Sequence, residues 1–324
     1  MPRHGVRVAL ATAAALAGMA YGCSYTPARF GSFERTLRVS GPVRLDVENG
    51  SGSVQIRAGE AGQVRIRGEV RARASFWQGS RQRMAEITTN PPIEQQGNLI
   101  RLGHDKERLR AVTVNYDIVV PAETELESEV GSGRLEVRGI HGPARATTGS
   151  GRITMENIGA DAVANTGSGA LELARVGGEV RAGTGSGSIT LSEIRGDIRA
   201  TTGSGGITID RPGGRIAAKT GSGGVTVNGA AADLRASTGS GSVTVEGNPE
   251  PNSYWELRTS SGRVAIGVPS SASFRLHARS NSGRIQTDIP LVIEERTKRE
   301  MRGRIGAGAA RVEAYTGSGA ISVR

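Results

Sequence analysis

The sequence predicts an all-β protein whose main domain is a β-solenoid, a parallel β-helix-like stack of 18-residue, two-strand coils. Three observations support this fold: an exact repeat, an alternation of apolar and polar residues within each repeat, and an unusual composition. The 324 residues include 48 glycines but only two Trp, five Tyr and four Phe. This composition excludes a conventional core built on aromatic side chains, and 36% apolar residues argue against wholesale disorder.

The repeat is marked by the tripeptide Gly-Ser-Gly. Seven copies, each 18 residues after the last, begin at Gly131, Gly149, Gly167, Gly185, Gly203, Gly221 and Gly239. Apolar residues stand four and six positions after each first glycine, as Ile189 and Leu191 do, with Glu or Thr between them. An alternation with period two predicts a short strand with one buried face.

A second strand is predicted in the other half of each unit, where an aliphatic residue, an alanine and a threonine alternate, as in Ile198, Ala200 and Thr202. Glycine suits the corners because it accepts positive φ and close backbone approach. One unit is too small to bury its own apolar face, so we expect stacked coils about 4.8 Å apart to share one interior. A β-sandwich or β-prism is the alternative, but strict unit identity favours the solenoid.

The chain divides into four predicted segments. They are a signal peptide (1–22), a lipid-anchored linker (23–38), an N-terminal β capping region (39–130), and the solenoid (131–324), which is regular to about residue 247 and irregular after it. The capping region holds one isolated copy of the repeat corner at residues 49–52, predicted strands at 64–73 and 112–120, and a candidate short helix at 80–87. Near the C-terminus, Ile321 and Val323 lie in a coil with no visible cover, so an exposed end coil is expected there.

The first residues predict export. Arg3 and Arg7 precede an apolar run over residues 8–20, which is too short to span a bilayer as a helix but fits the core of a signal peptide. The single cysteine, Cys23, follows in Ala-Tyr-Gly-Cys, which resembles the bacterial lipoprotein box, although that pattern prefers leucine where Ala20 stands. We expect lipidation at Cys23 and anchoring in the cell envelope, in the outer membrane if the host has two membranes. Plain cleavage after Gly22 is the alternative.

The formal charge of +10 stays positive after the leader is removed. Export and the lack of Lys or Arg clusters interleaved with aromatics argue against nucleic acid, so anionic envelope polymers or glycans are the expected partners. The candidate binding surface comprises Arg65, Arg67, Arg71 and Arg73 along one strand, and Arg145, Arg181, Arg199 and Arg235 in one column of the repeat.

Acidic residues accompany both sets of arginines. The first set could pair across adjacent strands with the alternating glutamates of residues 123–129, and otherwise becomes a basic patch. The second set stands two positions after an acidic column of the repeat. That column is made of Asp161, Glu179, Asp197 and Asp233. A salt-bridged ladder is the favoured interpretation of that column, ahead of a catalytic or substrate-binding row.

No pattern indicates catalysis, a metal or a cofactor. His104, His141 and His277 are far apart and lack ligand spacing, and the Gly-Ser-Gly serines do not match a nucleophile elbow. Calcium is improbable because the corners contain no aspartate. Two alternatives stay open: a carbohydrate-active solenoid enzyme acting on an anionic glycan, and a structural envelope-stress protein that self-associates through its end coils.

The sequence consists of a leader with a lipoprotein box, one early repeat copy, an insert, and then repeated T-G-S-G-x-I-T-L units. Over residues 39–324 the arrangement resembles the bacterial putative-adhesin β-strand-repeat family, whose function is unknown. The resemblance implies an envelope location and brings no catalytic residues. The leading hypothesis is a non-enzymatic envelope lipoprotein that presents an extended solenoid surface for adhesion, envelope-polymer binding or scaffolding.

Overall fold

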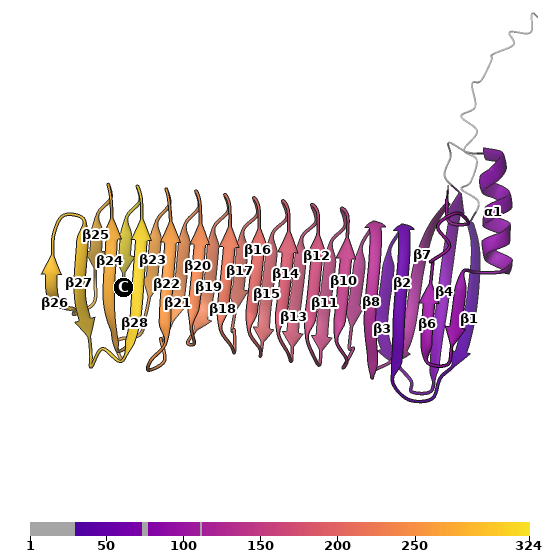
Figure 1. Ribbon diagram of the computed structural model, residues 1–324, viewed down its shortest axis with the longest axis horizontal. Coiled ribbons are helices and arrows are strands. Elements are labelled where there is room, and N and C mark those ends of the chain that lie inside the picture. The colour runs from indigo at the N-terminus through magenta and orange to yellow at the C-terminus, as the bar shows by residue number, and fades with distance from the viewer. Residues whose placement is uncertain (1–29, 73–76, 111) are drawn as a thin grey trace, which may run out of the picture.

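The chain forms an elongated stack of β-strands (Figure 1) in a computed structural model that describes residues 30–72, 77–110 and 112–324. The described residues contain 29 strands and one helix, α1 (Trp77–Thr89). Sheet A has 14 strands and sheet B has 15, and their inner faces enclose one apolar core. The predicted all-β solenoid is confirmed.

Each regular coil contributes one strand to sheet B and the next strand to sheet A. The sheet B strands are β8 (Thr124–Ser132), β10 (Ala144–Thr148), β12 (Ala162–Thr166), β14 (Val180–Thr184), β16 (Ile198–Thr202), β18 (Ile216–Thr220), β20 (Leu234–Thr238) and β22 (Tyr254–Thr259). The sheet A strands are β9 (Leu135–Arg138), β11 (Ile153–Ile158), β13 (Leu171–Val176), β15 (Ile189–Ile194), β17 (Ile207–Asp210), β19 (Val225–Ala230), β21 (Val243–Gly247) and β23 (Val264–Gly267). Neighbouring coils pair in parallel and in register, so Ile189 lies between Leu171 and Ile207.

At the N-terminal end of the stack, the isolated repeat copy lies beside the regular coils, although the two are far apart in the sequence. The strands of this end are β1 (Phe30–Arg38), β3 (Val54–Gly59), β4 (Gln63–Ala72) and β7 (Val112–Pro121) in sheet A, and β2 (Val43–Ser51), β5 (Ile93–Gln96) and β6 (Leu99–Leu102) in sheet B. The coil β2–β3 lies between β6–β7 and β8–β9, so Val54 pairs with Tyr116 on one side and Leu135 on the other. Residues 30–38, which the sequence assigned to a linker, pair as β1 with β4.

The C-terminal end is also interleaved. It contains β24 (Phe274–Ser280), β25 (Ile285–Thr287), β26 (Val292–Arg296), β27 (Glu300–Ile305), β28 (Ala310–Thr316) and β29 (Ile321–Val323). The coil β28–β29 lies between β22–β23 and β24–β25, so the yellow β28 stands beside the orange β22 in Figure 1. The expectation of an exposed end coil at Ile321 and Val323 is therefore wrong, because both side chains are buried between strands on either side. Antiparallel β27 and β26 extend sheet B beyond β24.

A ladder of buried hydroxyls joins the Gly-Ser-Gly corners. In the coils that contain β12 to β28, a threonine hydroxyl, or that of Ser280 in β24, accepts a hydrogen bond from the second glycine's amide and donates one to a glycine carbonyl of the neighbouring coil. Thr202 Oγ1 lies 3.2 Å from the amide nitrogen of Gly205 and 2.9 Å from the carbonyl oxygen of Gly187. The same pair of bonds is made by Thr166, Thr184, Thr220, Thr238, Thr259, Thr316 and Ser280.

The corner glycines are required by the closeness of neighbouring coils. A Cβ on Gly205 would lie 1.8 Å from the carbonyl oxygen of Gly187, and a Cβ on Gly203 would lie 2.4 Å from that of Gly185. Positive φ, the other reason expected from the sequence, applies among the described corner glycines only to Gly52 (φ +116°) and Gly133 (φ +156°). Tight stacking is therefore the reason for glycine in the regular coils.

Aliphatic residues and alanines fill the interior of the regular coils, and the aromatic side chains are buried toward the two ends of the stack. The predicted columns of aliphatic residues and alanines are buried along the whole stack. Among the described residues the buried aromatics are Phe33 and Tyr116 near one end, and Trp255 and Phe274 near the other. The scarcity of aromatics in the composition thus matches the aliphatic filling of the regular coils.

Thr202→Val tests the hydroxyl ladder. The substitution keeps the side-chain shape but removes the partner of the Gly187 carbonyl and the Gly205 amide, so we expect a loss of about 1–3 kcal/mol in unfolding free energy. The change is measured as a lower guanidinium midpoint by circular dichroism. Thr208→Val, on the outward face of β17, is the matched control and should change stability by less than about 0.5 kcal/mol. Equal midpoints for both variants would contradict the role of the ladder.

Candidate binding surface

The four arginines predicted from the repeat lie in one row on the outward face of sheet B. Read strand by strand from β10 to β20, the row consists of Arg145, Val163, Arg181, Arg199, Ala217 and Arg235. All four arginines are exposed. Because the coils stack in register, the row runs along the long axis of the stack and crosses the strands.

The acidic column beside this row has a structural role. Asp197 Oδ1 accepts a hydrogen bond from the backbone amide of Arg215, and Asp233 Oδ1 accepts one from the amide of Tyr254, both at 2.9 Å. Asp161 makes the same contact nearer the N-terminus. Each of these carboxylates ties its own coil to the next one.

The predicted salt-bridged ladder is present in part. Two arginines of the row form ion pairs: Arg181 with Glu179 (2.7 Å) and Arg235 with Glu256 (3.5 Å). Arg215, from the acidic column, pairs with Asp197 at 3.2 Å. Within residues 30–72, 77–110 and 112–324, Arg145 and Arg199 form no ion pair with a carboxylate. Arg145 stands beside Glu127 of β8 in the register, whereas Arg199 stands between Arg181 and Ala217.

A hollow of about 450 Å³ opens where Ala217 interrupts the row. Its lining includes Arg199 on β16 and Arg235 on β20, on the two sides of Ala217, together with Arg215. The side chains of Arg215 and Arg235 are 70% and 73% exposed, so their guanidinium groups are accessible to a ligand in solution.

Tyr254 lines this hollow and also a second one, of about 410 Å³, on the side of β28 and β24. Its hydroxyl donates a hydrogen bond to Glu313 Oε2 at 2.7 Å. The guanidinium carbon of Arg311 lies 5.7 Å from the centre of the tyrosine ring, and Arg311 also pairs with Glu313 at 2.6 Å. Burial, and then the hydrogen bond to Glu313 and its charge, raise the pKa of Tyr254 to about 12. The same hydrogen bond lowers the pKa of Glu313.

A family model described as Toastrack DUF4097 matches residues 43–324, which is most of the chain. The protein belongs to the Toastrack DUF4097 family. No curated protein matches the chain.

Two solved structures are similar to this Toastrack chain in part. One is described as "a putative cell adhesion protein" from Clostridium sporogenes, with 13% identity, 90% of this chain and 98% of that chain covered, and a TM-score of 0.22. The other is "a putative adhesin" from Bacteroides fragilis, with 9% identity, coverages of 90% and 97%, and a TM-score of 0.24. Similarity at this level carries no argument about ligands or activity.

Tyr254, Arg311 and Glu313 were not predicted as site residues of this Toastrack domain. They lie beyond residue 247, where the 18-residue spacing fails and the columns cannot be extended by counting. The available signal is the alternation that continues through Trp255 and Leu257, which places Tyr254 on the strand after Asp233. Arg311 becomes its neighbour only through the interleaved coil β28–β29.

The arginines of β4 lie on sheet A, apart from the row on sheet B. Arg65, Arg67 and Arg71 project from sheet A, whereas the glutamates of residues 123–129 belong to or border β8 in sheet B, so the proposed cross-strand pairing is wrong. Arg71 instead lies 3.8 Å from Glu69 and over the ring of Phe30. Arg73 lies outside the described residues.

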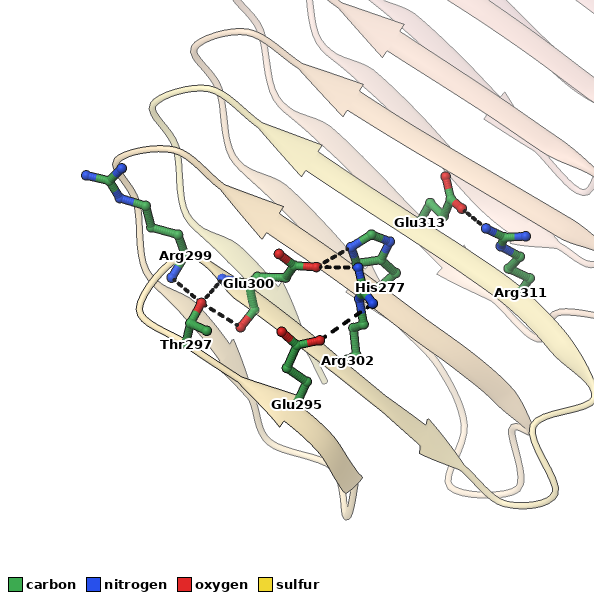
Figure 2. A network of polar contacts seen from close by, with 8 residues as sticks. All are labelled: His277, Glu295, Thr297, Arg299, Glu300, Arg302, Arg311 and Glu313. Carbon is green, nitrogen blue, oxygen red and sulfur yellow. Dashed lines mark hydrogen bonds and ion pairs between the residues drawn. The ribbon is translucent and has the colours of Figure 1, made fainter.

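A polar network joins the last hairpin of the Toastrack domain to the stack (Figure 2). Glu300 Oε1 accepts hydrogen bonds from His277 Nε2 at 2.9 Å and pairs with Arg302 at 2.8 Å. Arg302 also lies 3.5 Å from Glu295 of β26. The hydrogen bond from His277, and then the charge of Arg302, lower the pKa of Glu300 below its ordinary value of 4.5.

The other two histidines among the described residues also contact carboxylates. His104 lies 3.2 Å from Asp46 and 3.4 Å from Glu48, and His141 lies 3.0 Å from Glu123. Over the described residues, no group of three or more His, Cys, Asp or Glu side chains is arranged to hold a metal ion.

The described part of the chain has no helix with the length and apolarity needed to cross a bilayer. Cys23 lies outside the described residues.

Glu300→Gln tests the hairpin network. A carboxyl whose pKa is lower in the folded state stabilises the fold fully above its unfolded pKa of about 4.5 and loses that contribution as the pH falls through the folded pKa. The variant should therefore have a lower guanidinium midpoint than the parent at pH above 4.5, with a difference that shrinks toward zero in stronger acid. Glu294→Gln, on the exposed strand β26, is the control for loss of one glutamate charge and should change the midpoint little at pH above 4.5. A difference for Glu300→Gln that stays constant with pH would contradict the assignment.

Proposed function

We propose that this protein is an exported, lipid-anchored and non-enzymatic envelope module, whose sheet B face binds an anionic envelope polymer. The observation that carries the proposal is the arginine row with its hollow at Ala217. There, Arg199 and Arg235 stand on either side of a small residue, and the protein leaves Arg199 without an ion-pair partner among the described residues. An adhesin-like role then follows from attachment of this face to glycans of the envelope or of a surface.

The rigidity of the stack supports binding of a long ligand. The arginines project from strands that are hydrogen-bonded on both sides, so their spacing is set before a ligand arrives and little ordering entropy is lost. Each exposed guanidinium contributes little alone, but a polymer can contact several of them at once. The electrostatic attraction between the arginines and an anionic polymer acts at long range, and it weakens as the salt concentration rises.

The enzyme alternative has one observation in its favour, because Glu179, Asp197 and Asp233 all line the hollow. Each of them already has a partner. Asp197 and Asp233 accept backbone amide hydrogen bonds, and Glu179 pairs with Arg181. Carboxylates that hold the coils together, in a hollow open to solvent, fit a binding wall better than a pair of catalytic acids.

Arg199→Ala combined with Arg235→Ala tests the binding surface. The mature chain is titrated with polygalacturonate, polyphosphate, lipopolysaccharide and neutral dextran at low and high salt, about 0.02 and 0.2 M, where screening differs strongly. We expect salt-sensitive binding to at least one anionic polymer, none to dextran, and a loss of about tenfold in the variant, or about 1.4 kcal/mol.

Arg134→Ala combined with Arg263→Ala is the charge-matched control. These two exposed arginines precede β9 and β23 of sheet A, so their loss should change the affinity less than about twofold if binding is local. Equal losses in the two variants would mean that net charge and not the row drives binding. No binding to any anionic polymer would contradict the proposed function and favour a scaffolding role.

Cys23→Ala tests the anchor. Without the thiol no lipid can be attached, so we expect the protein to move from the membrane fraction to the soluble fraction on cell fractionation. Cys23→Ser is a second variant of the same kind that keeps the side-chain size. Membrane association that persists in both variants would exclude lipidation at Cys23 as the anchor, without affecting the proposal for sheet B.

A further inference from the structure

The two hollows on sheet B share one side chain. Tyr254 lines the hollow of about 450 Å³ together with Arg199 and Arg235, and it lines the hollow of about 410 Å³ together with Arg275 and Arg311. Both volumes fall within the range of small-molecule sites, about 300–1,000 Å³. In the register of the sheet, Tyr254 stands between Asp233 on one side and Arg311 on the other.

The tyrosine ring is held in place by the protein. Glu313 accepts the hydrogen bond of its hydroxyl and pairs with Arg311, whose guanidinium group lies over the ring. Arg311 lines the second hollow and not the first, whereas Tyr254 lines both. A fixed aromatic face beside arginines offers apolar contact to a sugar ring and charge to its acidic group.

The charges of the lining favour one class of anion. Besides arginines, the first hollow contains Glu179, Asp197 and Asp233, and the second contains the polar residues Asn252 and Ser253. A dense polyphosphate would meet carboxylates as well as arginines along this path. A sugar acid carries one carboxylate and several hydroxyl groups, and these hydroxyls can donate hydrogen bonds to the acidic side chains.

The geometry points to one continuous groove with two subsites, divided by Tyr254, that binds an acidic polysaccharide of uronate type. The inference rests on the proposed function and names its ligand class. From Arg199 on β16 to Arg275 on β24 the groove crosses five strand spacings, or about 24 Å. A single sugar can occupy only one hollow, so affinity depends on the length of the oligosaccharide.

Binding of galacturonate oligomers of increasing length tests the groove, with isothermal titration calorimetry as the readout. We expect hexagalacturonate to bind at least about tenfold more tightly than digalacturonate, and Tyr254→Leu to weaken hexagalacturonate binding about tenfold. Tyr254→Phe, which keeps the ring but loses the bond to Glu313, should weaken it only about threefold. Tyr315→Leu is the matched control, because Tyr315 projects from β28 on the same sheet face and lines neither hollow, and it should leave binding unchanged.

Separate outcomes distinguish this inference from the proposed function. If Tyr254→Leu binds as tightly as the parent while the double arginine variant loses binding, the surface is a polyanion site but the groove does not extend past Tyr254. Tighter binding of polyphosphate than of polygalacturonate would overturn the assignment to uronates. Equal affinity for the di- and hexasaccharides would overturn the two-subsite arrangement. If the parent chain binds no polyanion at all, both the proposed function and the uronate groove are wrong.

Discussion

The hydroxyl ladder at the Gly-Ser-Gly corners sets the geometry on which the surfaces of this protein depend. Each threonine joins its own coil to the next through glycine backbone groups, at a place where neighbouring coils are too close for a Cβ. A bond made at the same place in successive coils fixes both their spacing and their register. The arginine row exists because of that register, since a slip of one residue would turn Arg199 into the core.

Contacts were predictable from the sequence wherever neighbours in space are also neighbours in the repeat. The spacing of 18 residues predicted the strands, the buried alanine column, and the alignment of Arg181 with Arg199. It failed where the order of coils in space departs from the order in sequence. Nothing in the repeat shows that β2–β3 and β28–β29 lie between other coils, and for that reason Ile321 was expected at an exposed end and Arg311 was not expected beside Tyr254.

The two faces of the stack differ although they are built from the same coils. On sheet A, Thr190, Thr208, Thr226 and Thr244 follow one another in register, and in the outward row two positions further on only Asp210 and Glu246 carry charge over these coils. On sheet B, the corresponding coils carry arginines, aspartates and Lys219. Since successive strands of a coil belong to opposite sheets, each face can acquire its own chemistry without altering the shared core. The candidate groove is accordingly confined to one side of the molecule.

The interleaved coils change how such a stack comes apart. In a simple array each unit touches only its sequence neighbours, so the terminal units unzip first and the rest follow. Here the outer coils are closed by contacts between distant segments, such as Asn49 with the Val114 carbonyl and Thr316 with the Gly262 carbonyl. Fraying of either end coil therefore opens the loop of chain between these segments, so each end comes apart as a unit larger than one 18-residue coil.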